Sequence, residues 1–495
     1  MYFHKQQGGS GTVEVQPAAN RPHFFSPMRR AAAAPSPPPD ALCSARGGAV
    51  LVGAASTYFF STGLQYCFGV VYKALLADAS LRGSHFSTSW ILSIAYFTYL
   101  AIGCVSGPFV SARGPRAAAF AGAACVACGF AASSLARDLT LLYFTYGVLV
   151  GAGCGLLNTA ATFTVTQTFV RRRSFALGVA LAGGGLGSIV LGPVIQYIVT
   201  AAGWRPALRV LAALAGIVLP LAALPFYYAG AASSSMCAAA ADAADEPLLE
   251  ASTATAEVES AAAGGEAAAG GEAPSFAAVA RIPELRWFLA GSFLYCGGFF
   301  TVLENLTNFL TEPQPTGAGL SPGTAALLGS LQGAMNVVGR FAIGAVGDVR
   351  GVSRVALAQA TVVLEALLIA GLALAPRAPA YAYFFAAAFG LCAGSATALQ
   401  PAIVAALLPT PALLAHALGF LYVVQSPAVL LIPTLASVAR DRLGGYAIVW
   451  AALPAAMLVG GVLMDPRTLA AAFRCCRGAA LQKPPAGGER GNDGA

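Results

Sequence analysis

The sequence predicts an all-α membrane protein in which twelve transmembrane helices form two six-helix pseudo-repeat halves. Of the 495 residues, 57% are hydrophobic and only 10% are charged, and the mean hydropathy is +0.70. A soluble domain usually carries about 25% charged residues. Apolar runs of about 20 residues, the length that spans a bilayer, recur along this chain. These observations indicate a polytopic membrane protein rather than a water-soluble enzyme.

Twelve apolar segments can be drawn, six on each side of a stretch rich in Ala, Gly and acidic residues. They lie at residues 48–76, 86–110, 115–136, 140–169, 174–199, 206–229, 284–311, 322–347, 352–375, 379–408, 411–439 and 443–464.

The segments divide the chain into five parts. We expect a disordered cytosolic N-tail (residues 1–47) and an N-terminal six-helix half (48–229). A flexible acidic Ala/Gly-rich cytosolic linker (230–283) then leads to a C-terminal six-helix half (284–464) and a cytosolic C-tail (465–495). The linker has too few bulky apolar residues to form a core. The N-tail lacks the hydrophobic segment of a signal peptide, and a transit peptide within it stays an open alternative.

The two halves repeat each other weakly. Ser111–Gly114, after the second segment, resembles Asp348–Gly351, after the eighth, at an offset of 237 residues. Phe175–Gly178, which opens the fifth segment, resembles His416–Gly419, which opens the eleventh, at an offset of 241 residues. Two similar offsets between corresponding segments favour a duplicated half. Parallel repeats of this kind are characteristic of major facilitator transporters.

The distribution of Lys and Arg predicts the orientation in the membrane. If the N-terminus is cytosolic, 19 of the 28 Lys and Arg residues fall on the cytosolic side, eight on the opposite side and one inside a segment. Loops facing the cytosol carry an excess of Lys and Arg. We therefore expect both termini in the cytosol. The plasma membrane is the expected location, with an organelle membrane as the alternative.

Several motifs carry a family resemblance. The stretch Phe169–Gly183, continuing to Gly187, combines an aromatic pair and a basic cluster with alternating small residues, and it resembles the fifth-segment signature of the monocarboxylate-transporter branch of the major facilitator superfamily. Further likenesses are Ser89–Ile91, Gly107–Arg116, Gly203–Arg205, Asn336–Arg340, Asp441–Gly444 and Tyr446. The resemblance covers about residues 48–464 and implies the major facilitator fold and a transport function.

The sequence also departs from this family's pattern. The acidic residue, Gly and Trp that open the family's first segment are missing around Gly47–Ala54. The lysine of proton-coupled members falls near Val70, with Lys73 about one turn later, and Asn336 replaces the acid one turn before the arginine. These positions bear on proton-coupled lactate or pyruvate transport and leave the expected fold unchanged.

Three ionisable residues lie at membrane depth in the C-terminal half. Charges there are costly and usually face a bundle interior or a cavity. The Arg340 guanidinium is a permanently charged fork of donors suited to a carboxylate, and a structural ion pair is its alternative role. Glu304 opens a polar cluster that includes Asn305, and it either approaches Arg340 at the substrate site or fixes two helices. For Glu365 we favour a helix-contact or headgroup role.

Other polar residues complete the candidate substrate site and the cytosolic loops. Tyr66, Asn158 and Asn336 are expected substrate-binding groups, although interhelical hydrogen bonding is at least as well supported for each, as it is for Gln332 and Gln425. The basic cluster Arg171, Arg172 and Arg173 is interpreted as a topogenic, lipid-facing patch. A gating role, in which it grips a neighbouring loop, is the alternative. Asp348 belongs to the same gating or topogenic group.

The leading hypothesis is a secondary active transporter that moves a small organic anion, in particular a monocarboxylate, by alternating access, with proton symport as an open addition. A uniporter or exchanger of a less charged solute, such as an aromatic amino acid, is the alternative within transport. A non-transporting receptor or scaffold is the alternative from another class. We expect no enzyme activity, cofactor, metal or nucleic acid; membrane lipid is an expected partner, and a single-span ancillary protein is left open.

Overall fold

A computed structural model describes residues 44–78, 81, 85–227, 274–313, 318–374, 379–443 and 446–465. Within these ranges the chain is helical and contains no β-strand. Apart from Asp465, the expected C-tail lies outside the described residues, as does most of the expected N-tail and linker. The last part of the expected linker is described, and it contains the short helix α12 (Phe276–Ala280).

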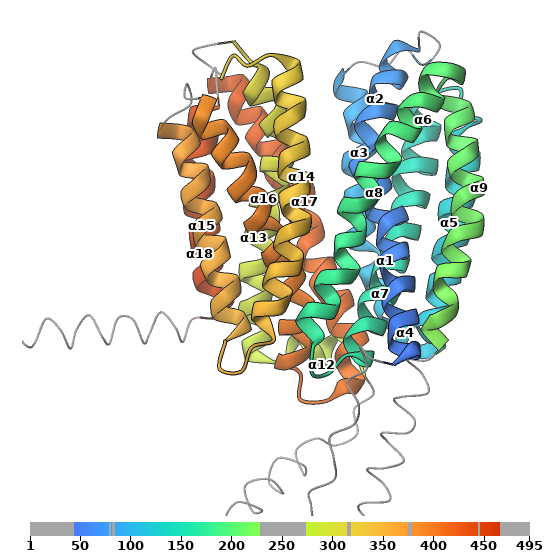
Figure 1. The fold of residues 1–495 in the computed structure, drawn as a ribbon, viewed down its shortest axis with the longest axis vertical. Coiled ribbons are helices and arrows are strands. Elements are labelled where there is room, and N and C mark those ends of the chain that lie inside the picture. The colour runs from blue at the N-terminus through green and yellow to red at the C-terminus, as the bar shows by residue number, and fades with distance from the viewer. Residues whose placement is uncertain are drawn as a thin grey trace, which may run out of the picture. The chain divides into compact units, whose positions relative to one another are not determined.

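The helices of the N-terminal half follow the six predicted segments (Figure 1). They are α1 (Ala45–Tyr66), α2 (Phe68–Ala77), α3 (His85–Ala101), α4 (Gly103–Arg113), α5 (Pro115–Ser133), α6 (Leu139–Leu142), the π-helix η2 (Tyr143–Val150), α7 (Gly151–Thr168), α8 (Arg173–Ala202), α9 (Trp204–Ala223) and the 3₁₀-helix η3 (Leu224–Phe226).

The C-terminal half follows its six segments in the same way. After α12 come α13 (Pro283–Thr311), α14 (Pro322–Gly347), α15 (Arg354–Leu374), α16 (Pro379–Leu407), the 3₁₀-helix η4 (Pro411–Leu413), α17 (Leu414–Leu443) and α18 (Ala447–Met464).

The predicted fold class is confirmed. Among the described residues, eight helices are long and apolar enough to cross a membrane, and a bent pair at Trp90–Ala101 and Gly103–Arg113 makes a ninth. Helix occupies each of the twelve predicted segments. The first segment is divided at Cys67 into α1 and α2, and the second bends by 41° at Ile102.

Two tight turns connect neighbouring spans of the N-terminal half. Gly114 has a φ of 85° and precedes Pro115, the first residue of α5. Gly203 has a φ of 91° and precedes Trp204, the first residue of α9. Residues with a side chain rarely adopt such φ values, so glycine allows these spans to reverse within one residue.

Close helix packing in the N-terminal half depends on the glycines of α8. A Cβ atom at Gly183 would overlap the backbone of Ala55, and one at Gly187 would overlap the carbonyl oxygen of Phe59. These glycines therefore set the separation of α8 from α1. Small residues permit such close approach in membrane proteins, where van der Waals contact rather than water exclusion holds helices together.

The packing of α8 on α1 predicts different effects on stability for Gly→Ala substitutions at two positions. Gly187→Ala should lower the apparent melting temperature, because overpacking costs about 1–3 kcal/mol. Gly216→Ala in α9 is the matched control, since its Cβ would meet only Ala127 Cβ at 3.7 Å. It should be neutral or stabilising by up to about 1 kcal/mol. Thermal unfolding of the purified variants in detergent checks both, and equal melting temperatures would contradict this packing argument.

Candidate functional site

The two halves meet closely where α8 packs against α14. A Cβ atom at Gly178 would overlap the backbone oxygen of Arg340, and one at Gly344 would lie 2.8 Å from the carbonyl oxygen of Ser174. The same two stretches therefore approach each other from both sides. Because neither backbone can move closer, this contact fixes the spacing of the halves near the start of α8.

A second contact of the same kind joins α4 to α17. A Cβ atom at Gly103 would overlap the backbone oxygen of Gly419, and one at Gly107 would lie 2.7 Å from the carbonyl oxygen of Ala415. Adding the first sequence offset to Gly103 and Gly107 gives Arg340 and Gly344, and adding the second to Ser174 and Gly178 gives Ala415 and Gly419. The repeat thus places equivalent helix pairs at two inter-half contacts.

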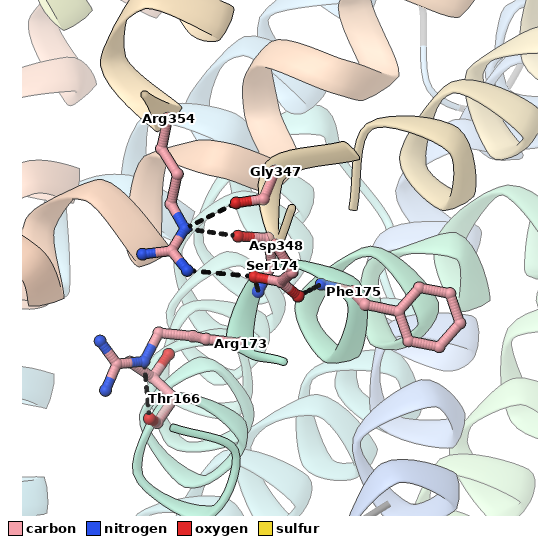
Figure 2. Close-up of polar contacts among 7 residues, drawn as sticks. All are labelled: Thr166, Arg173, Ser174, Phe175, Gly347, Asp348 and Arg354. Atoms are coloured by element: carbon pink, nitrogen blue, oxygen red, sulfur yellow. Dashed lines mark hydrogen bonds and ion pairs between the residues drawn. The ribbon is translucent and has the colours of Figure 1, made fainter. Parts of the chain in front are cut away.

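Asp348 secures the contact between α8 and α14 (Figure 2). Its carboxylate accepts hydrogen bonds from the backbone N–H groups of Ser174 (3.1 Å) and Phe175 (2.8 Å), which open α8. The first N–H groups of a helix have no partner within it, and they carry partial positive charge. Asp348 therefore stabilises the N-terminus of a helix in the other half.

Arg354 completes this cluster, which we call the latch (Asp348, Arg354 and the Ser174–Phe175 turn). Its Nη2 atom pairs with Asp348 at 3.1 Å, and its Nε atom donates to the Ser174 hydroxyl at 2.9 Å and to the Gly347 carbonyl at 3.1 Å (Figure 2). The Asp348 side chain is only 8% exposed, so solvent screens this pair less than it screens a surface pair. Asp348 was among the predicted site residues, whereas Arg354 was not.

The related contact between α4 and α17 lacks this carboxylate. The residue equivalent to Asp348 is Ser111, which is exposed. At the start of α17, the buried ring of His416 packs edge-on against Phe276 of α12 at 5.6 Å. The helix-capping carboxylate of the latch is therefore present at one of the two otherwise equivalent contacts and is replaced at the other.

The basic cluster lies beside the latch. Arg173 donates from Nε to the Thr166 carbonyl at 3.1 Å, within its own half (Figure 2). Arg171 and Arg172 are exposed. Arg173 also interacts electrostatically with Asp348 and Arg354 of the other half, so the gating role left open for the basic cluster stays a prediction.

Two further ion pairs join elements that belong to the same half. Asp78, just after α2, accepts from Trp204 Nε1 at 2.9 Å and from Arg205 Nη1 at 2.8 Å. Glu312, just after α13, accepts from Arg440 Nη2 at 2.8 Å. Each of these pairs joins elements of one half, whereas the latch connects both halves.

A buried polar chain crosses the interface of the halves farther from the latch. The Tyr58 hydroxyl of α1 hydrogen-bonds the Thr162 hydroxyl of α7, which lies 3.3 Å from the Tyr422 hydroxyl of α17. Tyr58 also donates to the Asn158 carbonyl at 3.5 Å, and the Asn158 side chain hydrogen-bonds Tyr422. Asn158 therefore belongs to an inter-half hydrogen-bond network, the alternative that sequence analysis left open.

Arg340 is a buried cation at this interface. It lies eight residues before Asp348, about 12 Å along the helix, and is 3% exposed. Its Nη1 donates to the Leu181 carbonyl of α8, its Nε has no partner, and it forms no ion pair with any described carboxylate. It interacts electrostatically with the hydroxyl groups of Tyr58 and Tyr295. Arg340 thus retains unused hydrogen-bonding capacity between the halves.

Glu304 does not pair with Arg340. It is half-buried on α13, and its electrostatic neighbour is Tyr96 of α3, whose ring packs edge-on against Phe300 at 5.0 Å. Tyr66 is 37% exposed and also interacts with Tyr96. The expected approach of Glu304 to Arg340 is absent among the described side chains, because Glu304 faces α3 while Arg340 donates to α8.

The remaining predicted site residues make helix contacts. Asn305 donates to the Thr301 carbonyl at 3.1 Å and accepts from the Ser437 hydroxyl of α17 at 3.5 Å. The backbone of Asn336 packs against Gly394 of α16. Gln425 donates to the Gln400 side chain at 2.9 Å, which links α17 to α16.

Comparison with known proteins identifies the class. A family model described as the Major Facilitator Superfamily matches residues 54–314. The chain belongs to this superfamily; it is a multi-pass membrane transporter, and members of this kind are not enzymes. Two solved structures share the fold: the transporter FucP in the outward conformation (TM-score 0.58, 17% identity, 84% of this chain and 98% of that one) and the human organic anion transporter MFSD10 (0.61, 16%, 85% and 100%).

Curated relatives narrow the kind of transporter. Monocarboxylate transporter 13 of Bos taurus is 28% identical over 425 residues, which are 84% of this chain and 89% of that protein. Monocarboxylate transporter 11 of Homo sapiens is 34% identical over 175 residues, which are 34% of this chain and only 36% of that protein. The chain is therefore monocarboxylate-transporter-like, as its motifs predicted.

The latch predicts a local change in backbone protection. Asp348→Ala removes the acceptor of the Ser174 and Phe175 amides, which costs about 1–2 kcal/mol for a capping group. Hydrogen exchange in the first turn of α8 should therefore accelerate about 5- to 30-fold. Hydrogen exchange with mass spectrometry on the purified protein measures this rate.

Asp138→Ala is the matched control, because Asp138 caps α6 through the Leu141 amide at 2.8 Å within one half. It should accelerate exchange at α6 and leave α8 unchanged. Unchanged exchange of the first turn of α8 in Asp348→Ala would contradict the latch.

Proposed function

We propose that this chain is a secondary active transporter of a small organic anion, in particular a monocarboxylate, and that Arg340 binds the anion. The observation that carries the proposal is one buried guanidinium at the interface of the halves with no ion pair among the described residues. A buried charge without a counter-charge is costly. A substrate carboxylate would supply that counter-charge and can accept two parallel hydrogen bonds from a guanidinium.

Alternating access requires that the contact between α8 and α14 opens and closes. The latch rests on a small number of hydrogen bonds and one ion pair, and the flanking glycines let the backbones slide without displacing side chains. Arg340 lies on α14 and donates to α8, so an anion that draws its guanidinium from the Leu181 carbonyl would also weaken this inter-half contact. Substrate binding is thereby connected to movement of the halves.

The proposal includes symport of a proton with the anion. Asn336 cannot carry a proton, and Glu304 is the acid within the predicted polar cluster of α13. Its half-buried carboxyl faces α3, across the interface of the halves. Tyr66 and Asn158 would contact the substrate from the N-terminal half, and Asn305 and Asn336 from the C-terminal half.

A less charged solute, such as an aromatic amino acid, is the second candidate. It is favoured by the tyrosine hydroxyls of Tyr58 and Tyr422 at the interface and by the existing bond between Arg340 and Leu181. Aromatic faces and hydroxyls suit a neutral aromatic solute. In that case Arg340 would mainly hold the halves together.

We further propose that both termini and the 230–283 linker face the cytosol, most simply in the plasma membrane. The Lys and Arg bias supports this orientation, and it places the latch on the cytosolic side. Labelling of a cysteine introduced into the linker, from each side in turn, tests it; external labelling would overturn it.

Removal of the Arg340 guanidinium should abolish anion transport. In proteoliposomes supplied with a panel of labelled monocarboxylates, Arg340→Ala should lose uptake, and Arg340→Lys should be impaired about tenfold or more because an ammonium cannot reproduce the bidentate geometry.

Glu304→Gln, assayed for pH-driven uptake and for substrate exchange, shows whether Glu304 carries a proton. Loss of pH-driven uptake with retention of exchange supports that role.

Arg442→Ala is the control, because Arg442 is an exposed arginine near the end of α17. It should retain uptake. Normal transport by Arg340→Ala would overturn the anion site, and uptake of neutral aromatic amino acids with no uptake of any acid would favour the second candidate.

A further inference from the structure

A second buried acid lies in the C-terminal half, away from the interface. Glu365 is the twelfth of the 21 residues of α15, about halfway along this helix, and is 0% exposed. Its carboxyl oxygens make no hydrogen bond of good geometry among the described residues, although the Tyr295 hydroxyl lies close enough to interact with them as a donor. Its burial is inconsistent with the predicted headgroup role.

The surroundings of Glu365 contain no cation that could neutralise it directly. No described Lys, Arg or His lies within ion-pair distance. Of the helices that pack on α15, α18 has no ionisable side chain, and α16 contributes Cys392, which interacts electrostatically with Glu365. Tyr381 of α16 donates to the Leu368 carbonyl at 2.6 Å one turn away. Because an isolated buried carboxylate costs several kcal/mol, a bound proton is the simplest way to hold this group.

Tyr295 of α13 links Glu365 to Arg340. Its side chain is 1% exposed, and its hydroxyl lies beside the Glu365 carboxyl without a hydrogen bond of good geometry among the described residues. The hydroxyl interacts electrostatically with Glu365 and, more weakly, with Arg340. A buried hydroxyl that interacts with both an acid and a guanidinium can transmit a change at one group to the other.

We propose that Glu365 is a proton-binding site of the transport cycle, coupled through Tyr295 to the anion site at Arg340. The inference rests on the proposed function in naming the anion site. It differs from proton transfer at Glu304, because Glu304 faces the N-terminal half and does not interact with Arg340.

The coupling has a definite sign. An unpaired Arg340 guanidinium disfavours protonation of Glu365, because it stabilises the negatively charged carboxylate. A bound anion neutralises the guanidinium, so the carboxyl then holds its proton more tightly. Linkage requires the reverse as well: a proton on Glu365 strengthens anion binding. The loaded carrier therefore holds one proton on Glu365 and one anion at Arg340, and both return to water when it unloads, which is symport with balanced charge.

Infrared spectroscopy of the full-length protein during a pH titration tests the site without any substrate. The wild type should show a buried carboxylic-acid C=O stretching band that Glu365→Gln lacks. Glu284→Gln, an exposed acid in the first turn of α13, is the matched control and should retain the band. Arg340→Gln should move the midpoint of this band to higher pH by about one unit or more, and Tyr295→Phe should change its frequency.

Transport of labelled pyruvate in proteoliposomes supplies the second readout. Glu365→Gln should lose accumulation driven by a pH gradient by about tenfold or more while retaining exchange of internal for external pyruvate. If Glu365→Gln does not fold, Tyr295→Phe, which retains the ring, carries the same test.

The outcomes separate the two proposals. If the wild type moves no pyruvate but the band depends on Glu365 and responds to Arg340→Gln, the proton site stands and the anion function fails. A band unaffected by Glu365→Gln, or full gradient-driven accumulation by that variant, would overturn the proton site.

Discussion

The arrangement of the two halves depends on the approach of the α8 N-terminus to the end of α14. Backbone meets backbone there because Gly178 and Gly344 carry no side chain, and the Asp348 carboxylate compensates the exposed amides that open α8. A helix N-terminus and an acid attract each other without a deep apolar interface. Such a contact can hold the halves together and still release them, as a transporter that alternates its access requires.

The position of Arg340 follows from this contact. Its backbone forms the surface on which Gly178 packs, and its side chain donates to Leu181 one turn farther along α8. The repeat-related position is Gly103, which also packs backbone to backbone but has no side chain. The same repeat position thus supplies packing alone in the N-terminal half and packing plus a positive charge in the C-terminal half. We therefore place anion recognition, and its coupling to the proton, in the C-terminal half.

Sequence predicted the fold well because hydrophobic length acts locally. The twelve apolar segments and the repeated motifs at Asp348 and His416 can be seen without a structure, whereas the turns at Gly114 and Gly203 were not predicted. Side-chain partners were harder to predict, because they depend on helix rotation. Glu304 faces α3 instead of Arg340 for this reason, and Arg354 was overlooked because a basic residue after a span looks like an ordinary topogenic charge.

The most direct test of the account is a pair of spin-label distances across the halves. One pair, at Arg171 and Arg350, reports the latch end, and the other, at the exposed positions Tyr197 and Leu327, reports the opposite ends of α8 and α14. The account predicts that Asp348→Ala lengthens the first distance and shortens the second relative to the wild type. Distances that stay unchanged at the latch end would contradict the claim that Asp348 holds the halves together.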